Sequence, residues 1–201
     1  MLAYIKGELA IKAQGYIVID VGGLGYKIFM SELAMDNIGN IGEQVKVHTY
    51  YRVTEDDISI FGFNTGEELH MFELLLSVSG VGAKTAVVII STIEPSDFAL
   101  AVISEDISEL VKIPGIGKKS AQRIVLELKD KLKKDAISVS AEKKATKKEE
   151  NNSQDVEEAM SALQVLGYNK KEIEKAFEKI DKSSSNIEEL IKKGLAQLSR
   201  N

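Results

Sequence analysis

Val78-Ser-Gly-Val-Gly-Ala-Lys-Thr-Ala86 is repeated, 35 residues later, as Ile113-Pro-Gly-Ile-Gly-Lys-Lys-Ser-Ala121. Both copies keep two glycines with one hydrophobic residue between them, then a lysine, a hydroxyl residue and an alanine. Around the copies, apolar residues recur with helical spacing, as at Leu69, Phe72 and Leu76. The repeat therefore predicts two helix-hairpin-helix elements, each with a Gly-hydrophobic-Gly turn.

The turn of each copy carries groups that suit a phosphate. Two glycines allow a sharp turn and a close approach of the backbone to another surface. A helix that begins directly after them presents unpaired N–H groups and the positive end of its dipole, which together bind anions. The hydrophobic residue between the glycines anchors the turn, and nearby basic side chains add charge. The candidate DNA-binding residues are Gly80, Val81, Gly82, Lys84, Gly115, Ile116, Gly117, Lys118, Lys119 and Arg123.

The number of copies decides between two interpretations of the motif. A single Gly-x-Gly turn is more often a plain connection between packed helices. Two copies, each followed by basic residues, favour a grip on both strands of a duplex, and such contacts position a protein on DNA without reading its bases. A nucleotide-binding loop, G-x-x-x-x-G-K-[ST], is excluded because it requires glycine directly before the lysine. Ala83 occupies that place in the first copy, and Lys112 stands where the second copy would need its first glycine.

Charge is distributed unevenly along the chain. The 201 residues have a net charge of −5, whereas DNA-binding proteins usually show a basic footprint. Between Lys112 and Lys134, however, eight basic side chains stand against two acidic ones, a local charge of +6. Lys118, Lys119 and Arg123 lie in the first turns after the second hairpin, where a phosphate would bind. For the lysines from 129 to 134, a solvated helix face is an equally good interpretation.

Residue types that are rare or absent exclude several kinds of function. The chain has no cysteine and only two histidines, His48 and His70, which lie far apart. Disulfides, thiolate nucleophiles and zinc fingers are therefore excluded, and a His-based metal site is not expected. We expect no catalytic residue, no metal and no cofactor. The start lacks the apolar core of a signal peptide and no apolar stretch is long enough for a bilayer, so we expect a cytoplasmic protein without membrane contact.

The first two segments of the chain differ in periodicity. Residues 1–63 contain about five stretches rich in β-branched and aromatic residues, which predicts a small barrel of the OB type, with a sandwich fragment as the competing fold. Residues 64–134 carry both hairpins and predict an all-helical domain. Within it, Ser96 is the expected N-cap of a helix.

The last two segments differ in composition. Residues 135–154 contain no aromatic residue and are expected to form a flexible linker. Residues 155–201 predict three short helices, with Asn169 and Asn186 capping the second and third. Four apolar residues of this bundle are expected to form its core or a partner surface, with core as the default: Leu163, Leu166, Phe177 and Leu190.

An acidic turn, Arg52-Val-Thr-Glu-Asp-Asp-Ile58, joins two of the expected strands. A solvated turn is the plainest interpretation of Glu55, Asp56 and Asp57. On a DNA-facing surface, however, carboxylates repel phosphates at close range, so an acidic pin at a four-way crossing would favour an open arrangement of strands. Metal-dependent nuclease chemistry would need further carboxylates to converge there.

Together these motifs resemble the RuvA family, the Holliday-junction-binding subunits of bacterial branch-migration complexes. The resemblance covers nearly the whole chain and implies a multidomain α+β fold: an N-terminal OB-fold β-barrel, a central all-α double helix-hairpin-helix domain, a linker and a C-terminal three-helix, UBA-like bundle. It rests on both hairpins and on Met1-Leu-Ala-Tyr-Ile-Lys-Gly7, Val21-Gly-Gly-Leu-Gly-Tyr26, Thr54-Glu-Asp56, Phe61-Gly-Phe63 and Ala162-Leu-Gln-Val-Leu-Gly-Tyr168.

The resemblance also implies a function and partners. It implies that the ten candidate residues grip the phosphates of a four-way junction and that Glu55 and Asp56 form an acidic pin at its centre, while Asp57 stays unassigned. It implies a homotetramer, with an octamer on DNA as a further assembly. Residues 155–201 would dock on the ATPase RuvB, which drives branch migration in recombination and DNA repair, and the resolvase RuvC would be a further partner. The chain itself would be non-catalytic.

A helix-hairpin-helix DNA repair enzyme, a glycosylase or a nuclease, is the alternative function. Such a glycosylase needs an acid placed shortly after the hairpin, and the only nearby acids, Glu127 and Asp130, lie on the second helix of the hairpin itself. Tryptophan is absent and no base-flipping pocket is evident. A pure protein-interaction scaffold is a third hypothesis, but it leaves the paired hairpins unexplained.

Overall fold

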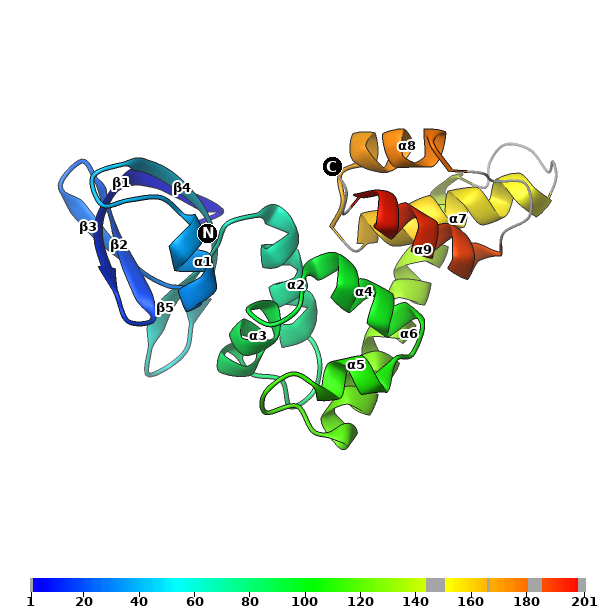
Figure 1. The fold of residues 1–201 in the computed structure, drawn as a ribbon, viewed down its shortest axis with the longest axis horizontal. Coiled ribbons are helices and arrows are strands. Elements are labelled where there is room, and N and C mark those ends of the chain that lie inside the picture. The colour runs from blue at the N-terminus through cyan, green and yellow to red at the C-terminus, as the bar shows by residue number, and fades with distance from the viewer. Residues whose placement is uncertain (1, 144–150, 166, 181–185, 199–201) are drawn as a thin grey trace.

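The structure is a computed structural model that describes residues 2–143, 151–165, 167–180 and 186–198. Three parts follow one another along the long axis of the molecule: a β-barrel, a helical middle part and a three-helix bundle (Figure 1). This arrangement confirms the predicted multidomain α+β fold. The boundaries between the four predicted segments stay predictions.

Five strands close the N-terminal part into a barrel, so the OB interpretation is right and the sandwich interpretation is wrong. The strands are neighbours in the order β1-β2-β3-β5-β4, and β4 pairs with β1 to complete the ring. All pairs are antiparallel except β3 with β5, which meet in parallel register at Phe29 and Phe61. This is the Greek-key strand order of an OB barrel, here closed. The strands are β1 (Tyr4–Ala13), β2 (Tyr16–Val21), β3 (Leu24–Phe29), β4 (Gln44–Val53) and β5 (Ile58–Phe63).

Alternating side chains fill the barrel. On β2, Ile17 and Ile19 are fully buried while their neighbours are not, as the period of a strand requires. A short helix that the sequence did not predict, α1 (Glu32–Asn37), follows β3. The Ser31 hydroxyl accepts the N–H of Ala34 at 3.2 Å and so caps this helix. Met35 of α1 is buried with the barrel side chains.

Five helices make the central part: α2 (Gly66–Leu76), α3 (Ala83–Ile90), α4 (Pro95–Ile103), α5 (Ile107–Val111) and α6 (Lys118–Lys143). The predicted cap at Ser96 is wrong. Helix α4 begins one residue earlier, at Pro95, and Glu94 is its N-cap. Proline suits the first helical position because its missing N–H would have no partner there.

Among the described helices, no single one is long and apolar enough to cross a membrane. One sharply bent pair, α3 with α4, passes that test of length and composition only when the two are taken together.

Helices extend into both ends of the predicted linker, residues 135–154. Helix α6 continues to Lys143, and α7 (Asn151–Val165) begins before residue 155. Alanine, lysine and glutamate in this segment have high helix propensity, which composition alone did not weigh against linker character. Residues 144–150 lie outside the described residues, so flexibility of the linker stays a prediction.

The C-terminal bundle consists of α7, α8 (Lys170–Glu178) and α9 (Ile187–Leu198). Both predicted caps are confirmed: the Asn169 side chain accepts the N–H of Lys171 at 3.0 Å, and that of Asn186 accepts the N–H of Glu189 at 2.9 Å. Three of the four expected core residues are buried, namely Leu163, Phe177 and Leu190. Leu166, the fourth, lies outside the described residues.

An aromatic cluster joins the barrel to the central helices. The ring of Phe72 on α2 is fully buried. Its centroid lies 5.2 Å from that of Tyr50, 5.3 Å from Phe61 and 4.9 Å from Phe63, which come from β4 and β5. Tilted and edge-on ring pairs at such distances stabilise beyond the area they bury. The strands β4 and β5 and the helix that leads to the first hairpin turn are therefore packed on one another.

The bundle also contacts the central helices. Gly167 has a φ of 96°, and a β-carbon there would lie 2.9 Å from His70 Cδ2 on α2, so only glycine fits this approach. Beside it, the Tyr168 hydroxyl shares a hydrogen bond with Ser96 of α4. Burial raises the pKa of Tyr168 to about 12.

Candidate nucleic-acid interface

The two repeated turns have the same backbone structure. In the first, the N–H of Val81 donates to Val78 O at 3.1 Å, and in the second the N–H of Ile116 donates to Ile113 O at 3.1 Å. The first hydrogen bonds of the following helices, from Ala86 to Gly82 O and from Ala121 to Gly117 O, are both 2.9 Å long. The sequence repeat is therefore a repeat of conformation. In Figure 1 both turns lie on the lower side of the molecule.

The first glycine of each turn is required by the backbone. Gly80 has a φ of 83° and Gly115 a φ of 81°, in the left-handed region that other residues enter at a cost. These two residues reverse the chain between the helices. The presence of glycine at this position in both copies is thus explained by folding alone.

The second glycine of each turn is not required by the fold. Gly82 has an ordinary extended conformation, with φ −94° and ψ 171°, and Gly117 is also outside the positive-φ region. A β-carbon on either residue would meet no atom within 4 Å. Space in front of these two residues is therefore left open, which suits close approach of another molecule to the backbone.

The helices that follow the turns leave their first N–H groups without side-chain partners. Gly82, the N-cap of α3, has no side chain to accept a hydrogen bond, and neither α3 nor α6 has an acidic residue in its first turn. In contrast, Thr65 caps α2 and Asp106 caps α5 through their side chains. The helix ends at the two turns can therefore still bind an anion.

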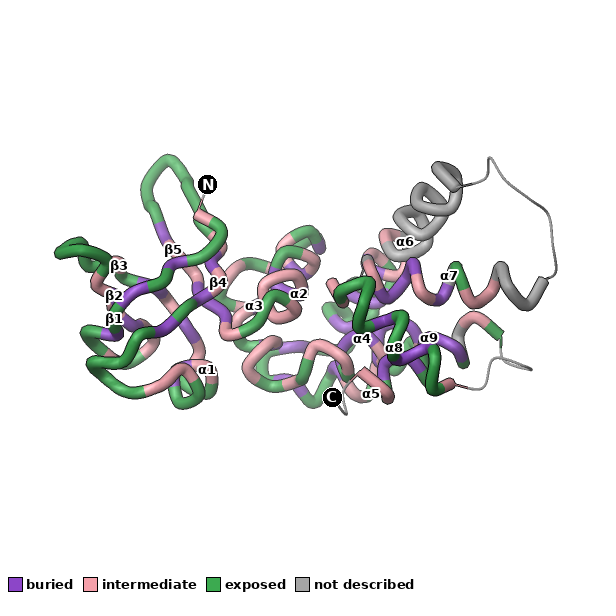
Figure 2. Tube along the Cα trace, turned by 90° about the horizontal axis from the view of Figure 1, so that it is seen from above, coloured by how far each residue is buried: buried purple, intermediate pink, exposed green. Residues whose placement is uncertain are grey.

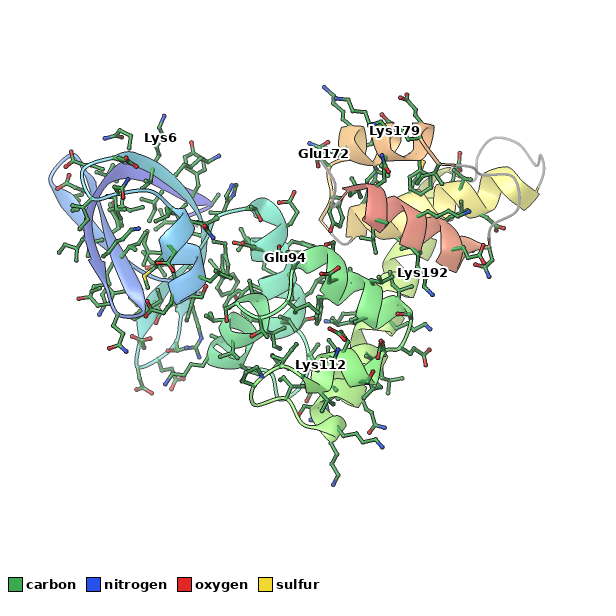
Figure 3. All side chains as sticks on the ribbon, viewed as in Figure 1. Lys6, Glu94, Lys112, Glu172, Lys179 and Lys192 are labelled. Carbon is green, nitrogen blue, oxygen red and sulfur yellow. The ribbon has the colours of Figure 1, made fainter. Side chains whose placement is uncertain are left out.

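Exposed basic side chains surround these helix ends. Lys84, Lys118 and Lys119 are exposed, and within the described part of the chain none of them forms an ion pair. Lys112, just before the second turn and labelled in Figure 3, is instead paired with Glu109 of α5. The three unpaired lysines therefore supply the positive charge beside the N-termini of α3 and α6.

The hydrophobic residue of each turn behaves almost as predicted. Ile116 is buried against the core of the central part. Val81 is only half-buried, although it packs on the same core. Anchoring of the turn by this residue is thus stronger in the second copy.

Arg123 is placed differently from the three lysines. Its Nη1 donates to Ser79 O, in the first turn, at 3.3 Å, although Arg123 itself follows the second turn. The side chain is still exposed, so its other N–H groups face solvent. Arg123 therefore joins the two turns as well as adding charge.

Two residues of α6 that the sequence did not single out for this site also reach the first turn. Glu127 Oε2 accepts the N–H of Ser79 at 2.9 Å. Lys131 Nζ donates to Ser77 O at 3.3 Å. Lys129, for which a solvated helix face was an equally good interpretation, forms an ion pair with Glu105, with 2.5 Å between Nζ and Oε1.

The three carboxylates of the acidic turn between β4 and β5 have different surroundings. The backbone of Asp57 closes the turn with Thr54 through bonds of 2.9 to 3.2 Å, and its carboxylate accepts a hydrogen bond from Ser59. Glu55 and Asp56 are exposed, and the structure gives neither carboxylate a partner among the described residues. Figure 2 shows this exposed loop projecting from the barrel. Asp57 is therefore a turn-forming residue, and Glu55 with Asp56 carry the projecting charge.

Within the residues that the structure describes, no three histidine or acidic side chains come together in a way that could hold a metal ion. The acidic turn thus has no further carboxylates converging on it.

The fold and the two turns define a class of protein, in which an OB-type barrel is joined to a tandem helix-hairpin-helix domain. Comparisons with known proteins agree. Residues 1–62 match the model of the RuvA N-terminal domain, residues 72–130 that of a SAM-like helix-hairpin-helix tandem, and residues 154–199 that of the RuvA C-terminal domain.

Relatives match over their full length. Proteins named Holliday junction branch migration complex subunit RuvA are 48% identical in Acetivibrio thermocellus and 44% identical in Clostridium perfringens, each covering all of both chains. A third, from Ruminiclostridium cellulolyticum, is 46% identical over 98% of this chain and all of its own. The chain belongs to the RuvA family.

Proposed function

We propose that this protein is a non-catalytic subunit that binds four-way DNA junctions through the sugar-phosphate backbone and recruits a motor for branch migration. The two turns would each hold a phosphate at a helix N-terminus, with Lys84 beside the first and Lys118 and Lys119 beside the second. Contacts of this kind recognise the path of the backbone and not the base sequence. Selectivity for a junction would then come from the arrangement of several such grips.

One observation carries this proposal: Gly82 and Gly117 are glycines that the fold does not need. At an N-cap, serine, aspartate or asparagine would stabilise the helix by accepting an N–H, and glycine gives up that stabilisation. An external acceptor that approaches the backbone closely explains the choice in both copies. A phosphate is the acceptor that the neighbouring lysines favour.

The acidic turn fits the same function. Glu55 and Asp56 project from the barrel without partners among the described residues. Carboxylates a few ångströms from a phosphate repel it. We therefore assign them as a pin that keeps strands apart at the centre of the junction.

Partners follow from the names of the relatives, which are subunits of a branch migration complex. We infer that residues 155–201 dock on the RuvB ATPase, that the RuvC resolvase is a further partner, and that the working form is a homotetramer or, on DNA, an octamer. A cytoplasmic location is inferred with these partners.

A binding competition tests the proposal. A labelled four-way junction is challenged with linear duplex of the same sequence at fixed salt and with Mg²⁺ present, and the mass of the complex and the length of the DNA strands are measured in parallel. We expect strong junction preference in a complex of four or eight chains, with intact strands. Equal affinity for both DNAs would refute junction recognition, and cleaved strands would support the repair-enzyme alternative.

A further inference from the structure

One face of α6 is attached to the first turn, although α6 begins at the second. Arg123, Glu127 and Lys131 follow one another at intervals of four residues, so they lie on one side of the helix. All three reach the backbone of the segment from Ser77 to Ser79, at 3.3, 2.9 and 3.3 Å. We name these three side chains the α6 ladder.

The ladder contacts backbone atoms, not side chains. Arg123 donates to a carbonyl, Glu127 accepts an amide N–H and Lys131 donates to another carbonyl. A turn that is held by its own peptide groups cannot shift along α6 without breaking these bonds. Since α6 also starts at the second turn, the ladder sets the distance and the angle between the two turns.

The ladder has no counterpart in the other copy of the repeat. A shift of 35 residues places Arg123, Glu127 and Lys131 on Val88, Thr92 and Ser96. Helix α3 ends at Ile90, so it is too short to carry such a row. Among the described residues, a row of side chains therefore bonds the helix that follows the second turn to the first turn, with no equivalent row from α3 to the second turn.

Glu127 is the least expected member on electrostatic grounds. A carboxylate beside a phosphate-binding turn opposes the binding of DNA. Its bond to the Ser79 N–H, the only interaction of its carboxylate with a described residue, accounts for its presence. We propose that Glu127 is a positioning residue that holds the first turn in register with the second, so that both can engage the two strands of one duplex together. This inference rests on the proposed binding of DNA by the turns.

Two variants of equal charge separate positioning from electrostatics. Glu127→Gln and Glu127→Met both remove the negative charge and keep the length of the side chain. Only glutamine keeps an oxygen that can accept the Ser79 N–H. Glu73→Met, at an exposed residue of α2, is the matched control because it removes one acidic charge from the same domain and leaves in place the backbone carbonyl of residue 73, which accepts the Ser77 N–H.

If Glu127 positions the turn, Glu127→Gln should bind junction DNA at least as tightly as the unmodified protein. Glu127→Met should bind about tenfold more weakly, the effect of losing one hydrogen bond to a charged group. A purely electrostatic role predicts that both variants bind more tightly, so equal affinity of the two would overturn the inference. Glu73→Met should not weaken binding.

A second measurement needs no DNA. Hydrogen exchange of the Ser79 amide should be faster in Glu127→Met than in Glu127→Gln, whereas exchange of the Ile116 amide in the second turn should be the same in both. Unchanged Ser79 exchange would overturn the inference by itself. If the exchange result holds but the unmodified protein shows no affinity for DNA, the proposed function fails and the attachment of the turns stands.

Discussion

Single alanine substitutions at the two glycines of the second turn, Gly115 and Gly117, should separate the requirements of folding from those of DNA binding. At Gly115, φ is 81°, and an alanine there would be strained although no atom lies within 4 Å of its β-carbon. The left-handed conformation costs about 1–2 kcal/mol in a residue with a β-carbon. Gly115→Ala should lower the free energy of unfolding by that amount.

At Gly117 the same methyl group meets neither strain nor crowding. Gly117→Ala should therefore change the stability of the protein little, because the unfolded chain loses freedom worth about 0.4–1 kcal/mol, while alanine is a poorer N-cap for α6 than glycine by about the same amount. The methyl group would nevertheless stand in the open space before the N-terminus of α6. Loss of one charge-assisted hydrogen bond there should weaken junction binding by about 1.5–3 kcal/mol, roughly tenfold to a hundredfold.

Urea unfolding, followed by tyrosine fluorescence, measures the free energy of unfolding of each variant. Fluorescence anisotropy of a labelled junction measures its affinity for DNA. Gly115→Ala serves as the reference for strain. Normal affinity in Gly117→Ala would refute the reasoning, because it would show that DNA does not come close to the backbone at this turn. A large loss of stability in Gly117→Ala would contradict the open space that the structure gives it.

Three further outcomes are expected. Replacing Lys118 and Lys119 with alanine should reduce the slope of log K against log[salt] by about 1.8, since each phosphate contact contributes about 0.9, and an unchanged slope would place these lysines away from the phosphates. Glu55→Gln with Asp56→Asn should raise affinity for linear duplex and so lower selectivity for the junction; selectivity equal to that of the unmodified protein would leave the loop a plain turn. In a spectroscopic titration, the difference between the unmodified protein and Tyr168→Phe should show a phenol with a pKa of about 12. Because the folded state favours the protonated phenol, its contribution to stability is complete below the unfolded pKa of about 10 and is lost as the pH rises through 12, whereas titration near 10 would place Tyr168 in water.

Local patterns in the sequence were enough to predict the strands of the barrel and the two repeated turns. The strands of the barrel were predicted because β-branched and aromatic residues cluster between turn residues, and both hairpin turns because one conformation is encoded twice. Helix α1 was missed because six residues are too few for a helical period, although Ser31 followed by Glu32 is a start signal. The cap of α4 was misplaced because Pro95 and Ser96 both signal a helix start and the proline prevailed.

Contacts between distant residues could not be predicted in the same way. Ser79 and Glu127 are separated by 48 residues, and the repeat offered no guide because the matching position is Thr92. Arg123 was selected for its charge and its place after the second turn, and its bond to the first turn needed the packing of α6 across the domain. The separate role of Asp57 likewise needed the geometry of the turn, in which its carboxylate accepts from Ser59.

Phe72 determines how this chain can be divided. Its ring belongs to the helical part by sequence, yet it is surrounded by Tyr50, Phe61 and Phe63 of the barrel. An exchange of the helical part alone between two members of the family would have to preserve this aromatic fit or leave a large ring exposed to water. A piece that runs from the first strand through the second hairpin keeps these ring contacts, so the barrel and the hairpins should be engineered as one unit.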